Sequence, residues 1–191
     1  ALNDPYDGGT HLPDIIAVLP VFVDGALVGY SACIAHQIDM GGRVPGSMAC
    51  DSTEIYQEGL RLPPLRLYRA GVPEETVFRI IERNVRMPET VLGDINSQIA
   101  ACRIGERGLT ELVDRYGREG FENYREALLD YTERRTRAEI AKLPDGDYSF
   151  SDFIDGDGFD SGVITIQVKI TVADEDMTID FAGTSPQVRG A

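Results

Sequence analysis

The apolar positions at the start of the chain follow the pattern of a β-hairpin. Residues 15–23 are β-branched and apolar, Asp24-Gly25 is a two-residue turn signal, and residues 26–36 are apolar again. Pro20 interrupts the first strand, which predicts an edge position or a bulge there. Because the second strand is apolar at most of its positions, we expect both of its faces to be covered.

From residue 73 onward the apolar residues recur with helical spacing. The pattern predicts a first helix that opens at Pro73, a second that opens at Pro88, and a third over residues 119–142. Gly117 is suited to cap the C-terminal end of the second helix or of a successor to it. We expect the third helix to bury one stripe of its surface, formed by Phe121, Tyr124, Leu128 and Tyr131.

After residue 146 the pattern changes to a period of two. Residues 147–153, 162–172 and 177–181 are typical of strands joined by turns rich in Asp and Gly. Strands and helices therefore come in separate runs along the chain instead of alternating. This order indicates an α+β fold.

The changes of pattern also divide the chain into segments. We expect a β-rich region at residues 1–72, a helical segment at 73–143 and an antiparallel β segment at 144–191. The sequence begins without Met and ends in turn-forming residues. We therefore expect these segments to belong to one incomplete domain of a longer polypeptide.

Composition and charge exclude two classes of partner. The net charge of −14 argues against nucleic acid, whose binding needs clustered Lys and Arg. No apolar run reaches the roughly 20 residues that a membrane-spanning helix needs, so we expect no membrane partner. The three cysteines form no C-x-x-C pair, which favours a reducing, cytoplasmic location over a disulfide scaffold.

The only two histidines in the chain share a spacing. His11 and His36 are each followed three residues later by an aspartate, Asp14 and Asp39. Imidazole and carboxylate are the usual ligands of Zn, Mn and Fe(II), and the predicted hairpin would bring the two pairs together. In an extended strand the +3 residue lies about 10 Å away, so the chain has to turn inside each pair. The alternative is that His11 caps a loop and His36 ends a strand, both with satisfied hydrogen bonds.

Six stretches of the sequence resemble the hydantoinase B/oxoprolinase family. This family includes the B subunits of ATP-dependent N-methylhydantoinases, the C-terminal part of 5-oxoprolinases, and subunits of acetone and acetophenone carboxylases. Its members are much longer than this chain. The stretch Asn3-Asp-Pro-Tyr-Asp-Gly-Gly-Thr-His-Leu-Pro-Asp14 carries the resemblance most specifically, and the others lie at residues 20–22, 35–42, 93–101, 155–158 and 179–190.

The resemblance implies a catalytic metal site. It would hold one divalent metal (Mn, Zn or Fe) and leave positions open for water or substrate. The implied ligands are His11, Asp14, His36 and Asp39, with Asp4 and Asp7 nearby as reserves. One departure from the family concerns Gln37, because many relatives carry a second histidine at that position.

The resemblance also implies a substrate contact on the second helix. Asp94 and Gln98 are four residues apart and share one polar face, where they are either substrate contacts or part of a solvated surface. The glycine-rich residues 41–46 lack the lysine and the following helix of a phosphate loop. ATP is therefore expected to be handled by a partner, a hydantoinase A-type ATP-binding subunit or domain.

These features lead to one preferred function and two alternatives. The preferred one is the metal-bearing subunit, or a fragment of it, of an ATP-dependent hydrolase of cyclic amides such as hydantoin or 5-oxoproline. We expect the isolated fragment to be inactive. The first alternative is a subunit of an ATP-dependent ketone carboxylase. The second is a metal-binding or interface module without catalytic activity of its own.

Overall fold

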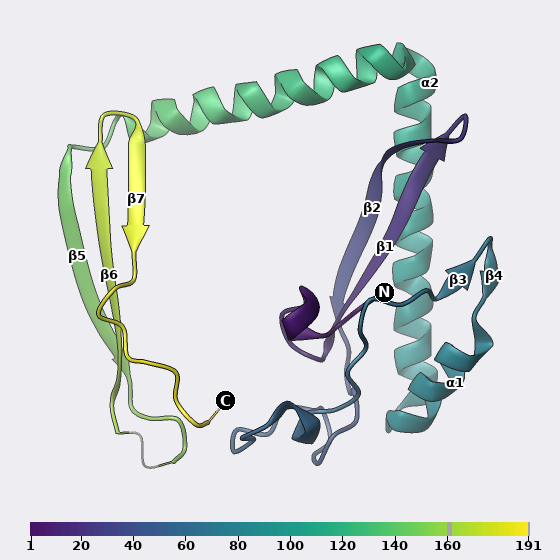
Figure 1. Ribbon diagram of the computed structural model, residues 1–191, viewed down its shortest axis with the longest axis horizontal. Helices are drawn as coiled ribbons and strands as arrows, with labels where there is room; N and C mark the ends of the chain where they lie inside the picture. Colours follow the sequence, from purple (N-terminus) through teal and green to yellow (C-terminus); the bar gives the residue numbers. More distant parts are fainter. Residues whose placement is uncertain (160–161, 191) are drawn as a thin grey trace. The chain divides into compact units, whose positions relative to one another are not determined.

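The computed structural model describes residues 1–159 and 162–190 (Figure 1). They form two compact units, Ala1–Arg118 and Glu119–Ala191. Both combine helix with antiparallel strands, which confirms the predicted α+β fold. The division between the units falls inside a long helix, whereas the three segments expected from the sequence follow the changes in secondary structure. Among the described residues, no helix is both long and apolar enough to cross a membrane.

The first unit contains two short 3-10 turns, two hairpins, one complete helix and the first part of a long second helix. In chain order its elements are η1 (Pro5–Asp7), β1 (Asp14–Val23), β2 (Ala26–His36), η2 (Ile55–Gln57), β3 (Tyr68–Arg69), β4 (Val72–Pro73), α1 (Glu75–Asn84) and the start of α2 (Pro88–Ile140).

Strands β1 and β2 form the hairpin that the sequence predicts. They pair in antiparallel register from Asp14 opposite His36 to Val23 opposite Ala26. The turn residues Asp24 and Gly25 both have positive φ, 50° and 77°, as the two central residues of a tight hairpin turn of this kind require. The register shifts between Val21 and Phe22, which confirms a bulge close to Pro20.

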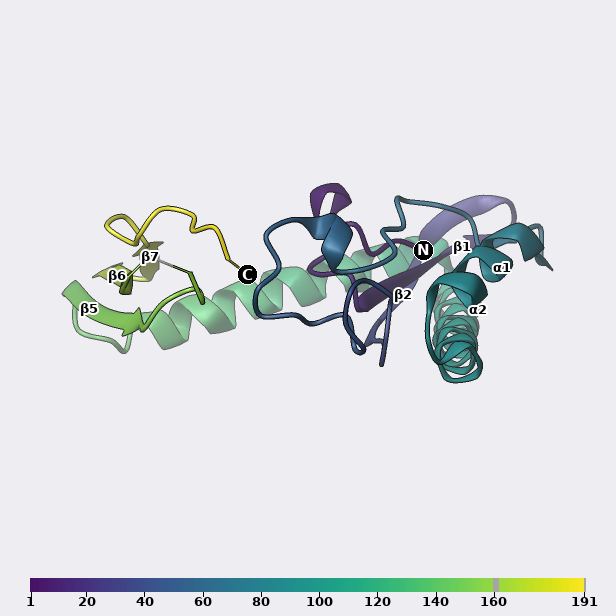
Figure 2. The ribbon, with the colours of Figure 1, turned by 90° about the horizontal axis from the view of Figure 1, so that it is seen from below.

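The two faces of this hairpin have different surroundings. Helix α2 runs alongside β1 and β2 (Figures 1 and 2), and Ile15 and Ala17 on β1 are buried. On the other face Tyr30 is 62% exposed and Ile34 is 54% exposed. The prediction that both faces of the second strand are covered is therefore wrong for the described residues. A two-stranded sheet with one helix packed on it leaves its other side chains facing solvent.

The core of the first unit joins the hairpin to both helices. It consists of Ile15, Met40, Leu62, Leu67, Ile81, Val85, Val91 and Ile95. Along α2 the buried residues Val91, Ile95, Gln98 and Cys102 recur at intervals of three or four, so one stripe of the helix faces the hairpin. Gly105 continues this stripe, and a β-carbon there would collide with the hydroxyl of Ser31 on β2. The missing side chain lets the helix lie close to the strand.

Gly117 interrupts α2 with the non-helical dihedrals φ 69° and ψ 161°. The predicted second and third helices therefore adjoin at the glycine that the sequence suggests as a cap. In the second unit α2 is followed by the antiparallel sheet β5 (Gly146–Ile154), β6 (Ile164–Ala173) and β7 (Asp176–Asp180), in that order.

The prediction that the third helix buries one stripe of its surface is wrong for the described residues. Phe121 is half-buried, but Leu128 and Tyr131 are 64% and 53% exposed, and Tyr124 is exposed as well. Apolar spacing identifies the helix, but a side chain becomes buried only where another element packs on that side of the helix.

Candidate metal centre

The chain turns between His11 and Asp14, as the geometry of the pair requires. The Asp14 N–H donates to the His11 carbonyl at 3.0 Å, and the intervening Leu12 and Pro13 are buried. This turn places His11 Nε2 3.1 Å from Asp14 Oδ2. The Thr10 hydroxyl donates to the same oxygen at 2.6 Å. The carboxylate is thus oriented by its own turn.

His36 joins this pair from the neighbouring strand. It lies opposite Asp14 in the last pair of the β1–β2 ladder, and the ring centroids of His11 and His36 are 5.0 Å apart. One ligand atom from each of His11, Asp14 and His36 lies within 4.8 Å of the other two. His11 and Asp14 are half-buried and His36 is exposed, so one side of this His–Asp–His group is accessible to solvent.

The donor set of this group suits a divalent cation. Two imidazole nitrogens and one carboxylate oxygen are ligands that Zn, Mn and Fe(II) accept, and catalytic sites commonly use three protein ligands. The group carries one formal negative charge when both imidazoles are neutral, so a cation would offset it. The three residues therefore fit the metal that the sequence suggests.

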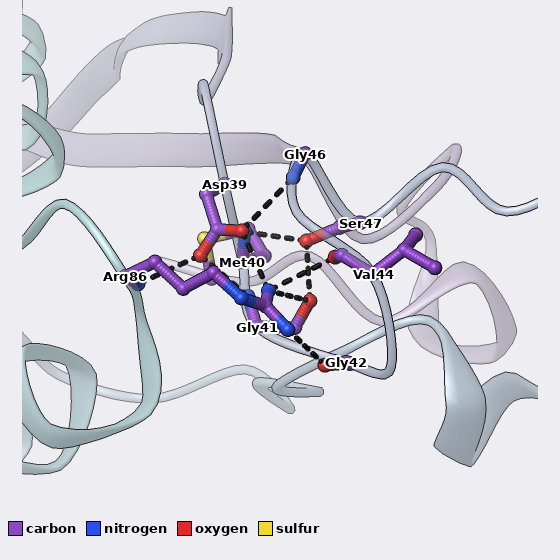
Figure 3. Close-up of polar contacts among 8 residues, drawn as sticks. All are labelled: Asp39, Met40, Gly41, Gly42, Val44, Gly46, Ser47 and Arg86. Atoms are coloured by element: carbon purple, nitrogen blue, oxygen red, sulfur yellow. Dashed lines mark hydrogen bonds and ion pairs between the residues drawn. The ribbon is translucent and has the colours of Figure 1, made fainter.

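Asp39, the fourth predicted ligand, lies apart from the His–Asp–His group. Its side chain is only 3% exposed. One carboxylate oxygen accepts from the N–H groups of Gly41 and Arg86, at 3.0 and 2.9 Å. The other accepts from the Gly46 N–H at 3.0 Å and from Arg86 Nη1 at 2.8 Å. Figure 3 shows these donors converging on the carboxylate.

The surroundings of Asp39 favour its ionised form. Burial alone would raise its pKa, but the hydrogen bonds from Arg86, Gly46 and Gly41 outweigh burial and hold the pKa of this carboxyl below its ordinary value. Asp39 is therefore a buried anion that holds the loop 40–47 and Arg86 together. Its four donors leave it engaged away from the two histidines.

Arg86 is the partner that the sequence reasoning missed. Its guanidinium also donates to the carbonyl oxygens of Gly41, Val44 and Gly42, at 3.1, 2.9 and 2.6 Å. Ser47 closes the same loop, because its hydroxyl accepts from the Met40 N–H and donates to the Gly41 carbonyl. The loop has no regular secondary structure, and these side chains satisfy its backbone groups. Arg86 stands in the link between two helices, where no local pattern marks it.

The reserve aspartates have different surroundings. Asp4 is buried, accepts from the Tyr6 N–H at 3.0 Å and lies 3.3 Å from Arg61 Nε. Asp7 is exposed. Neither belongs to the His–Asp–His group.

Gln37 and Gln98 pair inside the protein. Gln37 is fully buried, and its amide nitrogen donates to the Ala35 carbonyl and to Gln98 Oε1, both at 3.2 Å. Gln98 is also buried, and its own amide nitrogen donates to the carbonyls of Ile15 at 2.7 Å and Cys33 at 3.3 Å. Gln37, the residue at which this chain departs from the family pattern, therefore makes a buried contact with α2.

Of the two expected substrate contacts, Asp94 is the accessible one. It is exposed, and it lines a shallow pocket of about 360 Å³ together with His36 and Ser97. Gln98 lines the same pocket, but its amide is already bonded to the protein backbone. The pocket therefore places an accessible carboxylate beside one residue of the His–Asp–His group.

Known proteins resemble this chain along its whole length. The family model described as hydantoinase B/oxoprolinase matches residues 1–191. A protein named as the B chain of a D-/L-hydantoinase from Pseudomonas sp. (strain NS671) is 39% identical over an alignment of 191 positions that covers 97% of this chain and 32% of that protein. The beta chain of the caprolactamase of Pseudomonas jessenii is 36% identical over 186 residues, again 97% of this chain and 32% of the relative. The chain thus spans about a third of the length of these relatives.

Solved structures share the fold. The crystal structure of the ATP-dependent caprolactamase from Pseudomonas jessenii matches with a TM-score of 0.92 and 35% identity, covering 99% of this chain and 32% of that one. A nucleotide-free structure of acetone carboxylase matches with a TM-score of 0.91 at 22% identity, covering 99% of this chain and 27% of that one, and so shows the fold alone. The family match covers every residue, and the chain belongs to the hydantoinase B/oxoprolinase family.

Proposed function

We propose that this chain carries the metal centre of an ATP-dependent cyclic amide hydrolase. The observation that supports it most directly is the approach of His11, Asp14 and His36, with one ligand atom of each within 4.8 Å of the others. Two relatives are named for hydantoin and caprolactam, which are both cyclic amides. A bound Mn, Zn or Fe ion would supply Lewis acidity toward a substrate carbonyl oxygen or a water molecule.

The residues around the group prepare it for a cation. Thr10 donates to Asp14 Oδ2, which leaves the lone pairs of Oδ1 and the remaining one of Oδ2 for a ligand bond. His11 Nε2 faces the same carboxylate at 3.1 Å, so two of the candidate ligand atoms already lie together. Because imidazole binds metals only when unprotonated, we expect binding to release protons and to weaken in acid.

Asp94 is the residue that we propose as the substrate contact. Its exposed carboxylate shares a pocket with His36, at a position where it can accept a hydrogen bond from a ring N–H of a cyclic amide. We assign Gln98 no such contact, because its amide is committed to backbone carbonyls.

We propose that a partner of the hydantoinase A type carries out the ATP-dependent step. Relatives named as the B, beta and delta components of their enzymes support an assembly of several chains. In this scheme the partner activates the ring with ATP, and this chain binds and orients the activated substrate. This chain spans only about a third of the length of its relatives. The complete enzyme would then need further residues as well.

A ketone carboxylase is the second candidate. The acetophenone carboxylase delta subunit of Aromatoleum aromaticum is 28% identical over an alignment of 190 positions that covers 97% of this chain and 27% of that relative. The same His–Asp–His group would serve either reaction. A metal-binding module without turnover when isolated is the third candidate.

Metal analysis of matched variants tests the site. We expect about one transition-metal ion per full-length protein, lost in His36→Ala and in Asp14→Asn. Asp7→Asn is the matched control, because it makes the same chemical change at an exposed aspartate outside the group and should keep the metal. A wild-type protein without metal, or an Asp14→Asn variant that retains it, would refute the proposed centre.

Substrate assays separate the two enzymes. With its partner, the full-length protein should hydrolyse a hydantoin or a lactam only when ATP is present. Consumption of acetophenone that depends on bicarbonate, without hydrolysis of cyclic amides, would favour the carboxylase. Turnover by residues 1–191 alone would contradict the expectation that this part is incomplete.

A further inference from the structure

One side chain of α2 binds both strands that carry the His–Asp–His group. Gln98 Nε2 lies 2.7 Å from the Ile15 carbonyl on β1 and 3.3 Å from the Cys33 carbonyl on β2. Ile15 follows Asp14 directly, and Cys33 lies three residues before His36. Gln98 therefore connects the helix to both strands within three residues of the candidate ligands.

A second contact fixes Gln98 itself. Its Oε1 accepts from Gln37 Nε2 at 3.2 Å, and the Gln37 N–H donates to the Pro13 carbonyl at 2.7 Å. Gln37 follows His36 and Pro13 precedes Asp14, so this contact continues the link across the end of the hairpin. Both glutamine side chains are buried, where such bonds are shielded from competition with water.

The ladder needs such a link at this end. Asp14 and His36 form its last pair. Leu2 bridges to Ile16 on β1, but β2, which carries His36, pairs only with β1 among the described residues, and one face of the hairpin is exposed. Isolated two-stranded hairpins are at best marginally stable in water, and their ends open first. Metal ligands have to be held within about 0.5 Å of the geometry that binds the ion. A hairpin end that opens would separate His36 from Asp14 and His11.

We propose that Gln98 is a positioning residue, which sets the spacing of Asp14 and His36 for the cation by binding both strands from the helix. This inference rests on the proposed metal centre. Gln98 contacts neither the ion nor the substrate in this scheme. Removal of a partner that orients metal ligands commonly costs ten- to a hundredfold in affinity. We expect about tenfold for Gln98, because it acts through the backbone.

The test compares cobalt binding by two variants of the full-length protein. Gln98→Leu keeps the approximate size of the side chain and removes its hydrogen bonds. Val113→Ala is the control, because Val113 is buried on the same helix in the same unit but lies about 22 Å further along the helix axis. Titration of metal-free protein with Co²⁺ gives the affinity, and the visible absorption of the bound Co²⁺ reports its ligand geometry.

We expect Gln98→Leu to bind Co²⁺ about tenfold more weakly, with an altered absorption spectrum, while Val113→Ala matches the wild type. Equal affinity and an unchanged spectrum in Gln98→Leu would overturn the positioning role and leave the metal centre intact. A wild type that binds no Co²⁺ would overturn the metal centre and, with it, this inference. An equal loss of affinity in Val113→Ala would show that general destabilisation, and not positioning, is responsible.

Two further measurements keep the test decisive. Hydrogen–deuterium exchange of the metal-free protein should be faster in peptides covering residues 14–17 and 33–36 of Gln98→Leu, and unchanged there in Val113→Ala. If Gln98→Leu does not fold, Gln37→Leu takes its place, because it removes the bond to Gln98 Oε1, together with one to the Ala35 carbonyl, and leaves the bonds of Gln98 to Ile15 and Cys33. We expect about a three- to fivefold loss of Co²⁺ affinity for that variant, below the range for direct orienting partners, and no loss would count against the proposal.

Discussion

Arg86 donates to the buried carboxylate of Asp39 from both its backbone N–H and its guanidinium, at 2.9 and 2.8 Å (Figure 3). Asp39 has the same +3 spacing from a histidine as Asp14, yet the two carboxylates have different partners. Asp14 faces His11 and His36 at a half-buried position, whereas Asp39 is enclosed by N–H donors. The two aspartates should therefore respond differently to the same substitution.

Asp39→Asn should lower stability and leave metal binding intact. An asparagine amide has only one acceptor oxygen. Its NH₂ group would take the place of the second carboxylate oxygen and would face N–H groups that now donate hydrogen bonds to that oxygen. We expect a loss of about 2–3 kcal/mol in the free energy of unfolding, measured with denaturant. The folded variant should still bind about one metal ion, whereas Asp14→Asn should bind none. Loss of metal from a folded Asp39→Asn protein would argue that Asp39 is a ligand.

The stability that Asp39 contributes should depend on pH. Its pKa is lower in the folded protein than its ordinary value, so the unfolded chain binds its proton more readily. This contribution is complete above the ordinary aspartate pKa of about 3.9 and is lost as the pH falls toward the lower folded value. The difference in unfolding free energy between wild type and Asp39→Asn should therefore shrink below about pH 4. A difference that stays constant down to about pH 2 would contradict this.

Arg86→Lys should weaken the loop 40–47 although it keeps the charge. A lysine ammonium cannot reproduce the planar fork that reaches Asp39 and three backbone carbonyls at once. We expect a loss of about 1–3 kcal/mol and faster proteolysis within the loop. Arg69→Lys is the control, because Arg69 forms one exposed pair with Glu74 and should change stability by less than about 0.5 kcal/mol. Equal effects of the two substitutions would refute the anchoring role of Arg86.

Gly41→Ala and Gly71→Ala should separate backbone strain from steric collision. The two glycines have nearly the same φ, 88° and 81°. A β-carbon on Gly71 meets nothing within 4 Å, whereas one on Gly41 would collide with the backbone oxygen of Asn84. We expect about 1 kcal/mol of destabilisation for Gly71→Ala and about 2–3 kcal/mol more for Gly41→Ala. Calorimetric unfolding would measure both, and similar losses would mean that the loop yields to the added methyl group.

Local patterns in the sequence predicted the β1–β2 hairpin, the course of the long helix and the three residues that meet in the His–Asp–His group. The Asp24-Gly25 turn and the flanking apolar runs predict the β1–β2 hairpin, because two residues with positive φ connect antiparallel strands directly. The distance between residues along an extended strand predicts the turn between His11 and Asp14, and the hydrogen bond from Asp14 to His11 makes that turn. The hairpin then brings His36 to both residues.

Only the tertiary structure decided which surfaces are buried. The apolar side chains of the β1–β2 hairpin and of the second part of α2 look alike in sequence, yet Ile15 is buried while Ile34 and Leu128 are exposed. Periodicity determines which side chains share a face of an element. Whether another element covers that face depends on packing between residues that are distant in the chain.

The sequence by itself determined that each histidine has an aspartate three residues later, and it thereby selected the residues that matter at this end of the hairpin. It could not separate Asp14 from Asp39, because their local spacing is identical. Arg86, 47 residues beyond Asp39, distinguishes the two aspartates, because it donates hydrogen bonds to the Asp39 carboxylate. Gln98, more than 80 residues beyond Ile15, binds the strand that carries Asp14. The role of a carboxylate depends on the charges and donors that the fold brings to it through space, and spacing along the chain does not contain that information.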